Sequence, residues 1–236
     1  MKKHILFIAF VVIFLVICFL FSAISDLIFT ASDLIEAGAE NEQPLIIIDA
    51  GHGGIDGGTS SKSGVVEKDV NLLISKNLAA LFRAAGYRVL ETRTEDILLS
   101  GYAKTHKKQA DLDARLALAH ANEDAIFISI HQNAFPLTSC RGTQVWYSPN
   151  DPLSAELAGA VQAAVREKLQ PTNTRKIKVA TSSIYLLKSM KNPSILIECG
   201  FLSNEEEATL LSSKEYRQAL SLVIFRAIHE KIPLGT

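Results

Sequence analysis

The chain has 236 residues, of which 48% are hydrophobic, and its 24 basic side chains nearly balance its 25 acidic ones. This length suits one domain with a short appendage and is enough to bury a sizeable core. The net charge of −1 excludes generic electrostatic binding to nucleic acid, and the high apolar fraction excludes a disordered chain. The mean hydropathy of +0.19 is high for a soluble protein, so we expect a concentrated apolar segment.

That segment lies at the N-terminus. An unbroken apolar run extends from Ile5 to Phe21 and follows Lys2 and Lys3. A soluble helix is not normally apolar on every face, and the run is longer than the roughly 7–15 apolar residues of a signal peptide. We therefore favour a membrane anchor within residues 1–24 over a cleaved signal segment, because about 17–25 residues span a bilayer. The two lysines predict a cytoplasmic N-terminus and a chain that otherwise lies outside the membrane.

The remaining chain divides into a spacer and one domain. Residues 25–43 carry five acidic side chains and are predicted to be a spacer, and residues 44–236 show no internal repeat and no second domain. Without the first 43 residues the chain has a net charge of +2, which is too small for a polyanion-binding surface. Cys140 and Cys199 are able to pair, but they form neither a disulfide framework nor a CxxC metal motif.

Strand patterns alternate with helix patterns from Leu45 onward. Short apolar runs predict strands, and apolar residues at helical spacing predict helices. The predicted strands cover residues 45–48, 87–92, 126–130, 143–147, 184–187 and 195–197, and the predicted helices carry the apolar residues of 70–85, 112–119, 153–165 and 216–228. This order implies an α/β fold in which a mainly parallel, twisted sheet is flanked by helices on both faces.

Unusual polar residues follow three of the predicted strands. His52 lies in the glycine-rich turn after the first strand, His131 follows the strand of residues 126–130, and Glu198 ends the strand of residues 195–197. Glu67 lies just before the first predicted helix. In open α/β sheets, sites form beyond the carboxyl ends of the strands, so we expect a shared site there.

Each of these residues alone has an ordinary explanation. A single histidine is usually exposed or hydrogen-bonded, Glu67 suits a helix N-terminus, and Glu198 suits a buried ion pair. Together, two histidines and one glutamate form the ligand set of a catalytic zinc ion with one position left for water. A further glutamate at an apolar strand end would be the general base, its pKa raised by desolvation.

Four short motifs surround these residues. They are DAGHGG at residues 49–54, EKD at 67–69, SIHQNA at 129–134 and IECGFLSN at 197–204. As a set, in this order, they resemble the zinc-dependent N-acetylmuramoyl-L-alanine amidases. The resemblance covers about residues 45–231.

The resemblance implies a ligand set and a substrate. It implies that His52, Glu67 and His131 hold Zn²⁺ and that Glu198 is catalytic. Residues 44–236 would then be a catalytic domain that acts on peptidoglycan, where it hydrolyses the amide between N-acetylmuramic acid and L-alanine.

The architecture also resembles one subgroup, the germination-specific cortex amidases of spore formers. The similarity rests on the polar insert after Arg93, which includes GYAK at residues 101–104, and on the single domain behind a short N-terminal segment. The implied role is to remove peptides from muramic acid so that muramic-δ-lactam can form, with the forespore intermembrane space as the implied location. The interval from His131 to Glu198 is too short for the regulatory helix of some division amidases, and the need for an activator protein stays open.

Two other functions stay open at this point. The same metal would serve a zinc carboxypeptidase that cuts the stem peptide, and a non-catalytic protein would only bind the cell wall. The complete set of His52, Glu67, His131 and Glu198 argues against the non-catalytic alternative.

Neighbouring polar residues have two possible roles each. We expect Asp49 either to hold the second nitrogen of a ligand histidine or to cap its own turn. Asn133 either binds substrate or fixes its loop. Arg175, Lys176 and Lys178 are predicted to lie in a solvated loop.

Overall fold

The computed structural model describes residues 21, 43–101 and 107–232, and residues from Pro44 onward form one compact unit. The predicted anchor within residues 1–24 lies, apart from Phe21, outside the described residues, and so does the spacer apart from Gln43. In the described part, no helix has both the length and the apolar character needed to span a bilayer. The elements, in chain order, are β1 (Leu45–Ala50), α2 (Glu67–Ala84), β2 (Arg88–Glu91), α3 (Lys107–His120), β3 (Ile126–Asn133), β4 (Gln144–Tyr147), α4 (Pro152–Lys168), β5 (Lys178–Val179), α5 (Tyr185–Ser189), β6 (Ser194–Phe201), α6 (Glu205–Ser212) and α7 (Lys214–His229).

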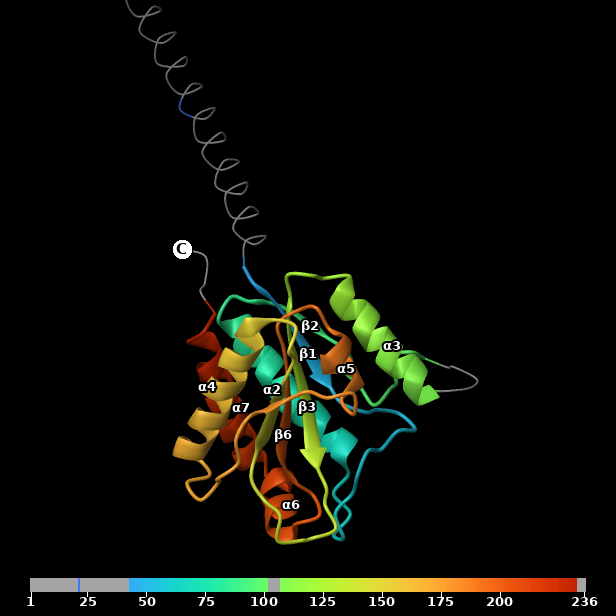
Figure 1. The fold of residues 1–236 in the computed structure, drawn as a ribbon, viewed down its shortest axis with the longest axis vertical. Coiled ribbons are helices and arrows are strands. Elements are labelled where there is room, and N and C mark those ends of the chain that lie inside the picture. Colours follow the sequence, from blue (N-terminus) through green and yellow to red (C-terminus); the bar gives the residue numbers. More distant parts are fainter. Residues whose placement is uncertain (1–20, 22–42, 102–106, 233–236) are drawn as a thin grey trace, which may run out of the picture. The chain divides into compact units, whose positions relative to one another are not determined.

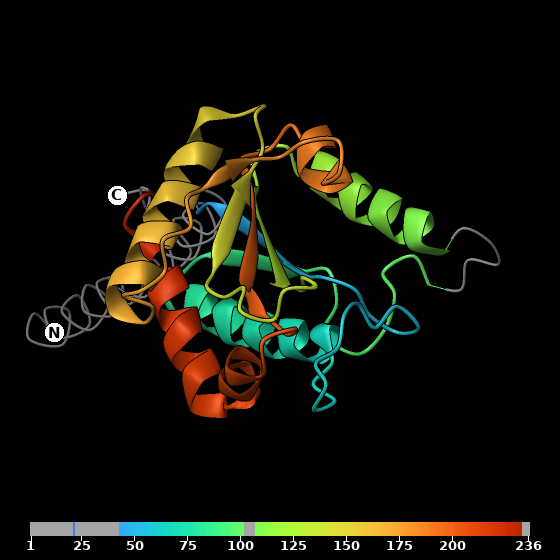
Figure 2. The same cartoon turned by 60° about the horizontal axis from the view of Figure 1, so that its bottom comes forward.

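The strands of the described residues form one mixed sheet in the order β2-β1-β3-β6-β4-β5. β1 pairs in parallel with β2 and β3, and β3 pairs in parallel with β6. β4 runs antiparallel to β6, and β5 runs parallel to β4. Helices cover both faces of this sheet (Figures 1 and 2). The predicted α/β fold with a mainly parallel sheet is therefore confirmed.

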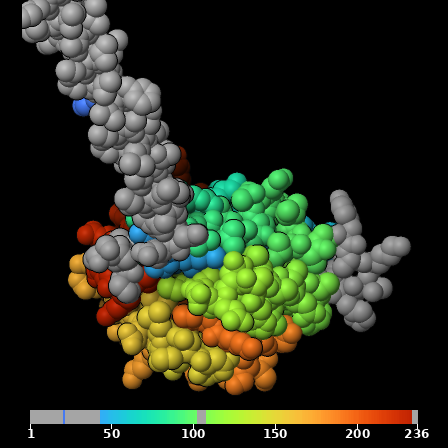
Figure 3. Space-filling model, turned by 90° about the horizontal axis from the view of Figure 1, so that it is seen from above, coloured from blue at the N-terminus to red at the C-terminus, as the bar shows by residue number. Residues whose placement is uncertain are grey.

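The two faces of the sheet are covered differently. Ile46 and Ile48 of β1 belong to the main core with buried side chains of α2, α4 and α7. Ile47, between them, belongs to a smaller cluster with side chains of α3 and α5. Successive side chains of a strand point to opposite faces, so α2, α4 and α7 lie on one face and α3 and α5 on the other. Figure 3 shows the light-green surface of α3 lying against the orange surface around α5.

This alternation decides which face carries the polar residues of β3 and β6. Phe127 of β3 belongs to the cluster under α3 and α5, so His131, four residues further on, points to the same face. Ile197 of β6 belongs to the main core, so Glu198 points to the opposite face. Both polar side chains thus lie on the face covered by α3 and α5, near the carboxyl ends of two neighbouring parallel strands.

Helix α2 begins at Glu67 itself, one turn earlier than the apolar pattern alone predicts. It buries an apolar stripe against the sheet and against α7. The helix ends before Gly86, whose φ of 91° is a conformation that glycine adopts at little cost. The amide of Gly86 donates to the carbonyl of Arg83, and the amide of Tyr87 donates to that of Phe82. Gly86 thus lies at the position where a glycine commonly terminates a helix.

Three local predictions were wrong or incomplete. Residues 184–187 were predicted to be a strand, but Tyr185–Ser189 form helix α5, because a short apolar run does not distinguish a strand from a buried helical turn. Lys178 was predicted to lie in a solvated loop, but Lys178–Val179 form the edge strand β5. Helix α6, of only eight residues, was not predicted, although the three glutamates of its first turn are favoured at a helix N-terminus.

Candidate active site

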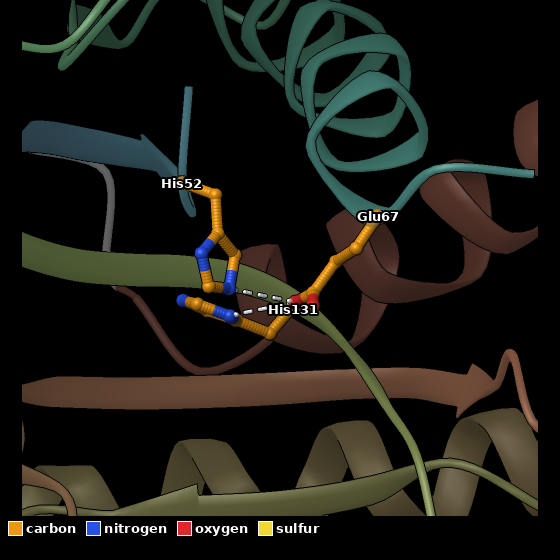
Figure 4. A group of neighbouring side chains, drawn as sticks. All are labelled: His52, Glu67 and His131. Atoms are coloured by element: carbon orange, nitrogen blue, oxygen red, sulfur yellow. Dashed lines mark hydrogen bonds and ion pairs between the residues drawn. The ribbon is translucent and has the colours of Figure 1, made fainter. Parts of the chain in front are cut away.

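Three of the predicted site residues converge from three separate elements. His52 lies just beyond β1, Glu67 begins α2, and His131 lies on β3 (Figure 4). Oε1 of Glu67 is 3.2 Å from Nε2 of His52 and 3.0 Å from Nδ1 of His131. One ligand atom from each residue lies within 4.8 Å of the other two. This is a possible metal site of the His, Glu, His type.

Two glycines leave the space that this convergence needs. A Cβ on Gly51 would lie 2.3 Å from Nε2 of His131, and a Cβ on Gly58 would lie 2.4 Å from Oε2 of Glu67. Any side chain at either position would displace the imidazole or the carboxylate. His52 itself has a φ of 61°, which is rare for a residue other than glycine and costs about 1–3 kcal/mol. The glycine-rich sequence of this turn thus serves the close approach of the three side chains.

Glu67 is oriented by hydrogen bonds from the backbone. Its Oε2 accepts from the amide of Thr59 at 2.8 Å, and its Oε1 accepts from the amide of Gln132 at 3.0 Å. The amide group of Asn71 lies 3.4 Å from the same Oε1. Because the side chain is only 4% exposed, these donors fix the carboxylate with its Oε1 toward both histidines.

The electrostatics of the three residues favour positive charge at their centre. Burial alone would raise the pKa of Glu67, but hydrogen bonds with His131 and His52 outweigh it and hold that pKa well below its usual range. Burial alone would lower the pKa of His52, but Glu67 and Asp56 outweigh it and raise that pKa. The carboxylate is thus ionised, and the group is suited to a cation.

Asp56, rather than Asp49, faces the second ring nitrogen of His52. Oδ2 of Asp56 lies 3.0 Å from Nδ1 of His52, at ion-pair distance. Asp56 belongs to the same glycine-rich turn, four residues after the histidine. Asp56 was not among the predicted site residues, although an acidic residue this close in sequence to a candidate ligand was a usable signal.

Both roles considered for Asp49 were wrong. The carboxylate is fully buried and forms an ion pair with Arg115 of α3. It also accepts from the hydroxyls of Thr92 at 2.8 Å and Ser129 at 2.6 Å. The pKa of Asp49 is lowered, since Arg115 and these hydroxyls outweigh the effect of burial. Asp49 therefore neutralises a buried guanidinium beneath the site.

Glu198 lies beside the three residues, in register with His131 across the pair of strands β3 and β6. Its Oε2 is buried and accepts no hydrogen bond from the described residues. Burial raises the pKa of Glu198 to about 7, with His131 opposing the rise and Glu67 adding to it. A carboxyl group with this pKa is able to accept and return a proton near neutral pH.

A cavity of about 250 Å³ opens above these residues. His52, His131 and Glu198 line it on the sheet side, and residues of α3 and α5 form the opposite wall. The hydroxyl of Tyr185 on α5 donates to Oδ1 of Asp113 on α3 at 3.1 Å, which joins the two helices of that wall. The volume is enough for an amide bond and its immediate substituents, but not for a whole glycopeptide.

The other histidines of the described residues lie outside this group. His120 is exposed at the end of α3, and Nδ1 of His229 lies 2.7 Å from the hydroxyl of Tyr87. Cys140 and Cys199 are free and not paired. Nothing in the described part resembles a second metal cluster of three His, Cys, Asp or Glu side chains.

The fold and the site define a hydrolase of the α/β class with a possible metal centre, and comparison with known proteins gives its family. Residues 46–230 match the model of the N-acetylmuramoyl-L-alanine amidase family. The chain belongs to this family, and the predicted amidase activity, rather than that of a carboxypeptidase or a silent binding protein, is confirmed.

Individual relatives agree. The chain is 35% identical over 189 residues to the germination-specific N-acetylmuramoyl-L-alanine amidase of Bacillus subtilis (strain 168), which covers 78% of both chains. It is similar to the CwlD amidase from Clostridioides difficile, solved in complex with the GerS lipoprotein, with a TM-score of 0.76, 36% identity and coverage of 80% of this chain and 98% of that one. The chain is also similar to an N-acetylmuramoyl-L-alanine amidase from Clostridium difficile 630, with a TM-score of 0.69 and 30% identity. This match covers 80% of this chain and 96% of that one.

Proposed function

We propose that the amidase is zinc-dependent, that His52, Glu67 and His131 hold the Zn²⁺ ion, and that Glu198 is the catalytic acid–base residue. The observation that carries this proposal is the convergence of three ligand atoms within 4.8 Å, beside a buried carboxylate oxygen of Glu198 that accepts no hydrogen bond from the described residues. The proposed substrate is the amide between N-acetylmuramic acid and L-alanine in peptidoglycan.

The donor set suits zinc more than a harder cation. Two imidazoles and one carboxylate are typical ligands of catalytic zinc, whereas Mg²⁺ and Ca²⁺ prefer oxygen ligands alone. A bound Zn²⁺ ion supplies a Lewis acid for the amide carbonyl and lowers the pKa of water to about 7.

Glu198 would transfer a proton from the attacking water to the leaving nitrogen. Its carboxylate accepts a proton from the attacking water while the new bond from water oxygen to the carbonyl carbon forms. It then delivers this proton to the alanine nitrogen as the carbon–nitrogen bond breaks. The products are the free lactyl carboxylate and a peptide with a new amino terminus. Burial raises the pKa of Glu198 to about 7 in the metal-free site, and the charge of a bound Zn²⁺ ion would lower it, which favours the carboxylate as the initial base.

The spore role is the narrower part of the proposal. It is supported by the similarity to the germination-specific relative from Bacillus subtilis. We infer that this chain removes peptides from cortex muramic acid, outside the cytoplasmic membrane, to which residues 1–24 anchor it. A deletion strain whose spore cortex retains its usual muramic-δ-lactam would contradict this role.

Mass spectrometry of digested peptidoglycan tests the reaction. We expect free stem peptides that begin with L-alanine, together with muramic acid that lacks a peptide. Loss of a terminal D-amino acid would instead indicate a carboxypeptidase. The assay is run on the full chain alone and with a cell extract, because the relative from Clostridioides difficile was solved with a lipoprotein. Turnover by the chain alone would exclude a required activator.

Substitutions test the proposed roles separately. We expect His52→Ala to lose both zinc and hydrolysis, and Glu198→Ala to keep zinc but to lose hydrolysis by about 10²-fold or more. His120→Ala is the control, since this exposed histidine lies outside the site. Zinc is measured by atomic absorption beside the digest. Full activity of Glu198→Ala would remove this residue from the mechanism.

A further inference from the structure

Three consecutive carbonyl groups at the end of β1 accept hydrogen bonds from two buried arginines. Nε of Arg93 donates to the carbonyl of Ala50 at 2.9 Å, and its Nη2 donates to that of Gly51 at 3.1 Å. Nη1 of Arg115 donates to the carbonyl of Ala50 at 3.0 Å, and its Nη2 donates to that of His52 at 2.9 Å. The backbone immediately before and at His52 is thus held by two guanidinium groups.

The two arginines come from different parts of the fold. Arg93 follows β2 and also donates to the carbonyl of Lys68 in the first turn of α2, at 2.7 Å. Arg115 lies on α3 and forms ion pairs with Asp49 and Asp111. The side chains are 3% and 2% exposed. Together they connect the turn that carries His52 to the helix that begins at Glu67 and to the helix that lines the cavity.

Burying two guanidinium groups at one turn has a high desolvation cost. Burial and the charge of Arg115 both lower the pKa of Arg93. Asp49 and Asp111 compensate Arg115, but among the described residues the hydrogen bonds of Arg93 go only to carbonyl oxygens. A neutral donor would satisfy these carbonyls at a lower desolvation cost. This cost indicates that Arg93 and Arg115 do more than fill space in the core.

We infer that Arg93 and Arg115 are positioning residues of the metal centre, a role that rests on the proposed zinc function. His52 has a left-handed backbone conformation, so its turn does not continue the strand ladder and needs other donors for its carbonyls. The arginine pair supplies them and fixes the direction of the imidazole toward Glu67. Removal of these donors lets the turn relax, which misplaces one of the three ligands and weakens the binding of zinc.

Arg93 is the better residue to test, because its removal leaves no carboxylate without a partner. Arg93→Lys keeps the positive charge, but a single ammonium group does not replace the planar donors that reach Ala50 and Gly51. The control is Arg217→Lys on α7, where Nη1 donates to the carbonyl of Leu211 at 2.8 Å, with no hydrogen bond to a site residue in the described part of the chain. Both substitutions remove a guanidinium donor to a backbone carbonyl.

The measurement is the zinc dissociation constant of the full chain, obtained by competition with a chromogenic chelator, beside the melting temperature of the metal-free protein. We expect Arg93→Lys to bind zinc about tenfold or more weakly than the wild type, and Arg217→Lys to stay within twofold. Zinc binding by Arg93→Lys within twofold of the wild type overturns the inference. An equal loss of affinity in both variants also overturns it, because a general loss of stability would then explain the effect.

The wild type separates this inference from the proposed function. A wild-type chain that binds zinc and releases peptides, together with an unaffected Arg93→Lys variant, contradicts only the role of the arginine pair. A wild-type chain that binds no zinc contradicts the proposed metal centre and the arginine role with it.

Discussion

The carboxylate of Asp56 lies 3.0 Å from Nδ1 of His52, while Nε2 of the same ring faces Glu67 at 3.2 Å. The imidazole therefore lies between two carboxylates, one near each nitrogen. An acidic partner on the far nitrogen selects the tautomer of a ligand histidine and increases its basicity. The turn from Gly51 to Gly58 thus contains both a candidate ligand and the residue that orients it.

We predict that Asp56→Asn weakens zinc binding by about tenfold, since the amide supplies no negative charge and lowers the basicity of His52. The dissociation constant is measured by chelator competition. Asp124→Asn, which changes an exposed acid outside the site, is the matched control. Unchanged zinc affinity in Asp56→Asn would show that the contact between these two side chains has no role in metal binding.

Glu198 gives a prediction about stability in the absence of metal. Its folded pKa of about 7 lies above the ordinary value of 4.5, so the protonated form favours the folded state. This contribution is fully present below pH 4.5 and is lost as the pH rises through about 7. Glu198→Gln mimics the neutral form, so it should stabilise the metal-free protein above pH 7 by up to about 3 kcal/mol and have little effect at pH 4.5.

Denaturant unfolding of both proteins in the presence of a chelator, at pH 4.5 and pH 8, measures this difference. A gain that is the same at both pH values would mean that the carboxyl group does not titrate between them. A loss at pH 8 would mean that the carboxylate has a stabilising partner in the folded state.

Two glycine substitutions distinguish the steric requirement at the site from the general effect of replacing a glycine. Gly51→Ala places a Cβ 2.3 Å from Nε2 of His131, so we expect zinc binding and hydrolysis to fall at least tenfold. Gly159→Ala lies in α4 with no atom within 4 Å of the new Cβ, and should stabilise the protein by up to about 1 kcal/mol with activity unchanged. Zinc content and melting temperature of both variants are compared. Normal zinc binding by Gly51→Ala would refute the steric argument.

The sequence predicted the sheet better than its surroundings. The first five residues of β3, Ile126–Ile130, are all buried, and four of them are apolar, so the strand pattern is clear. Helix α5 was missed because Leu186 and Leu187 pack into two different clusters, and such an apolar run has no period that distinguishes a helix from a strand. Strand β5 has only two residues and is paired through β4, a tertiary contact that no local pattern encodes.

In the candidate site, likewise, single residues were predictable from the sequence but their contacts were not. His131 and Glu198 were identifiable because a polar residue at the end of an apolar strand is unusual. Their proximity was not, since it depends on the register of β3 with β6. Asp49 was expected either to hold a ligand histidine or to cap its own turn, whereas its true partner, Arg115, is 66 residues away on a helix whose apolar pattern makes it look like a core element. Motif spacing alone carries no information about such a partner.

The unequal covering of the sheet has a consequence for motion. In the described residues, 27 buried apolar side chains form the core under α2, α4 and α7, but only nine, divided between two clusters, lie on the face covered by α3 and α5. A thinly packed layer opens at a lower free energy than the rest of a domain. Amide hydrogens of α3 should therefore exchange with solvent well before those of β3, and zinc should slow this exchange through Arg115 and His52. Helix α3 forms one wall of the cavity, and the substrate of this cavity is a bulky polymer. This wall would then open more readily than the rest of the domain, while the β-sheet beneath it stays folded.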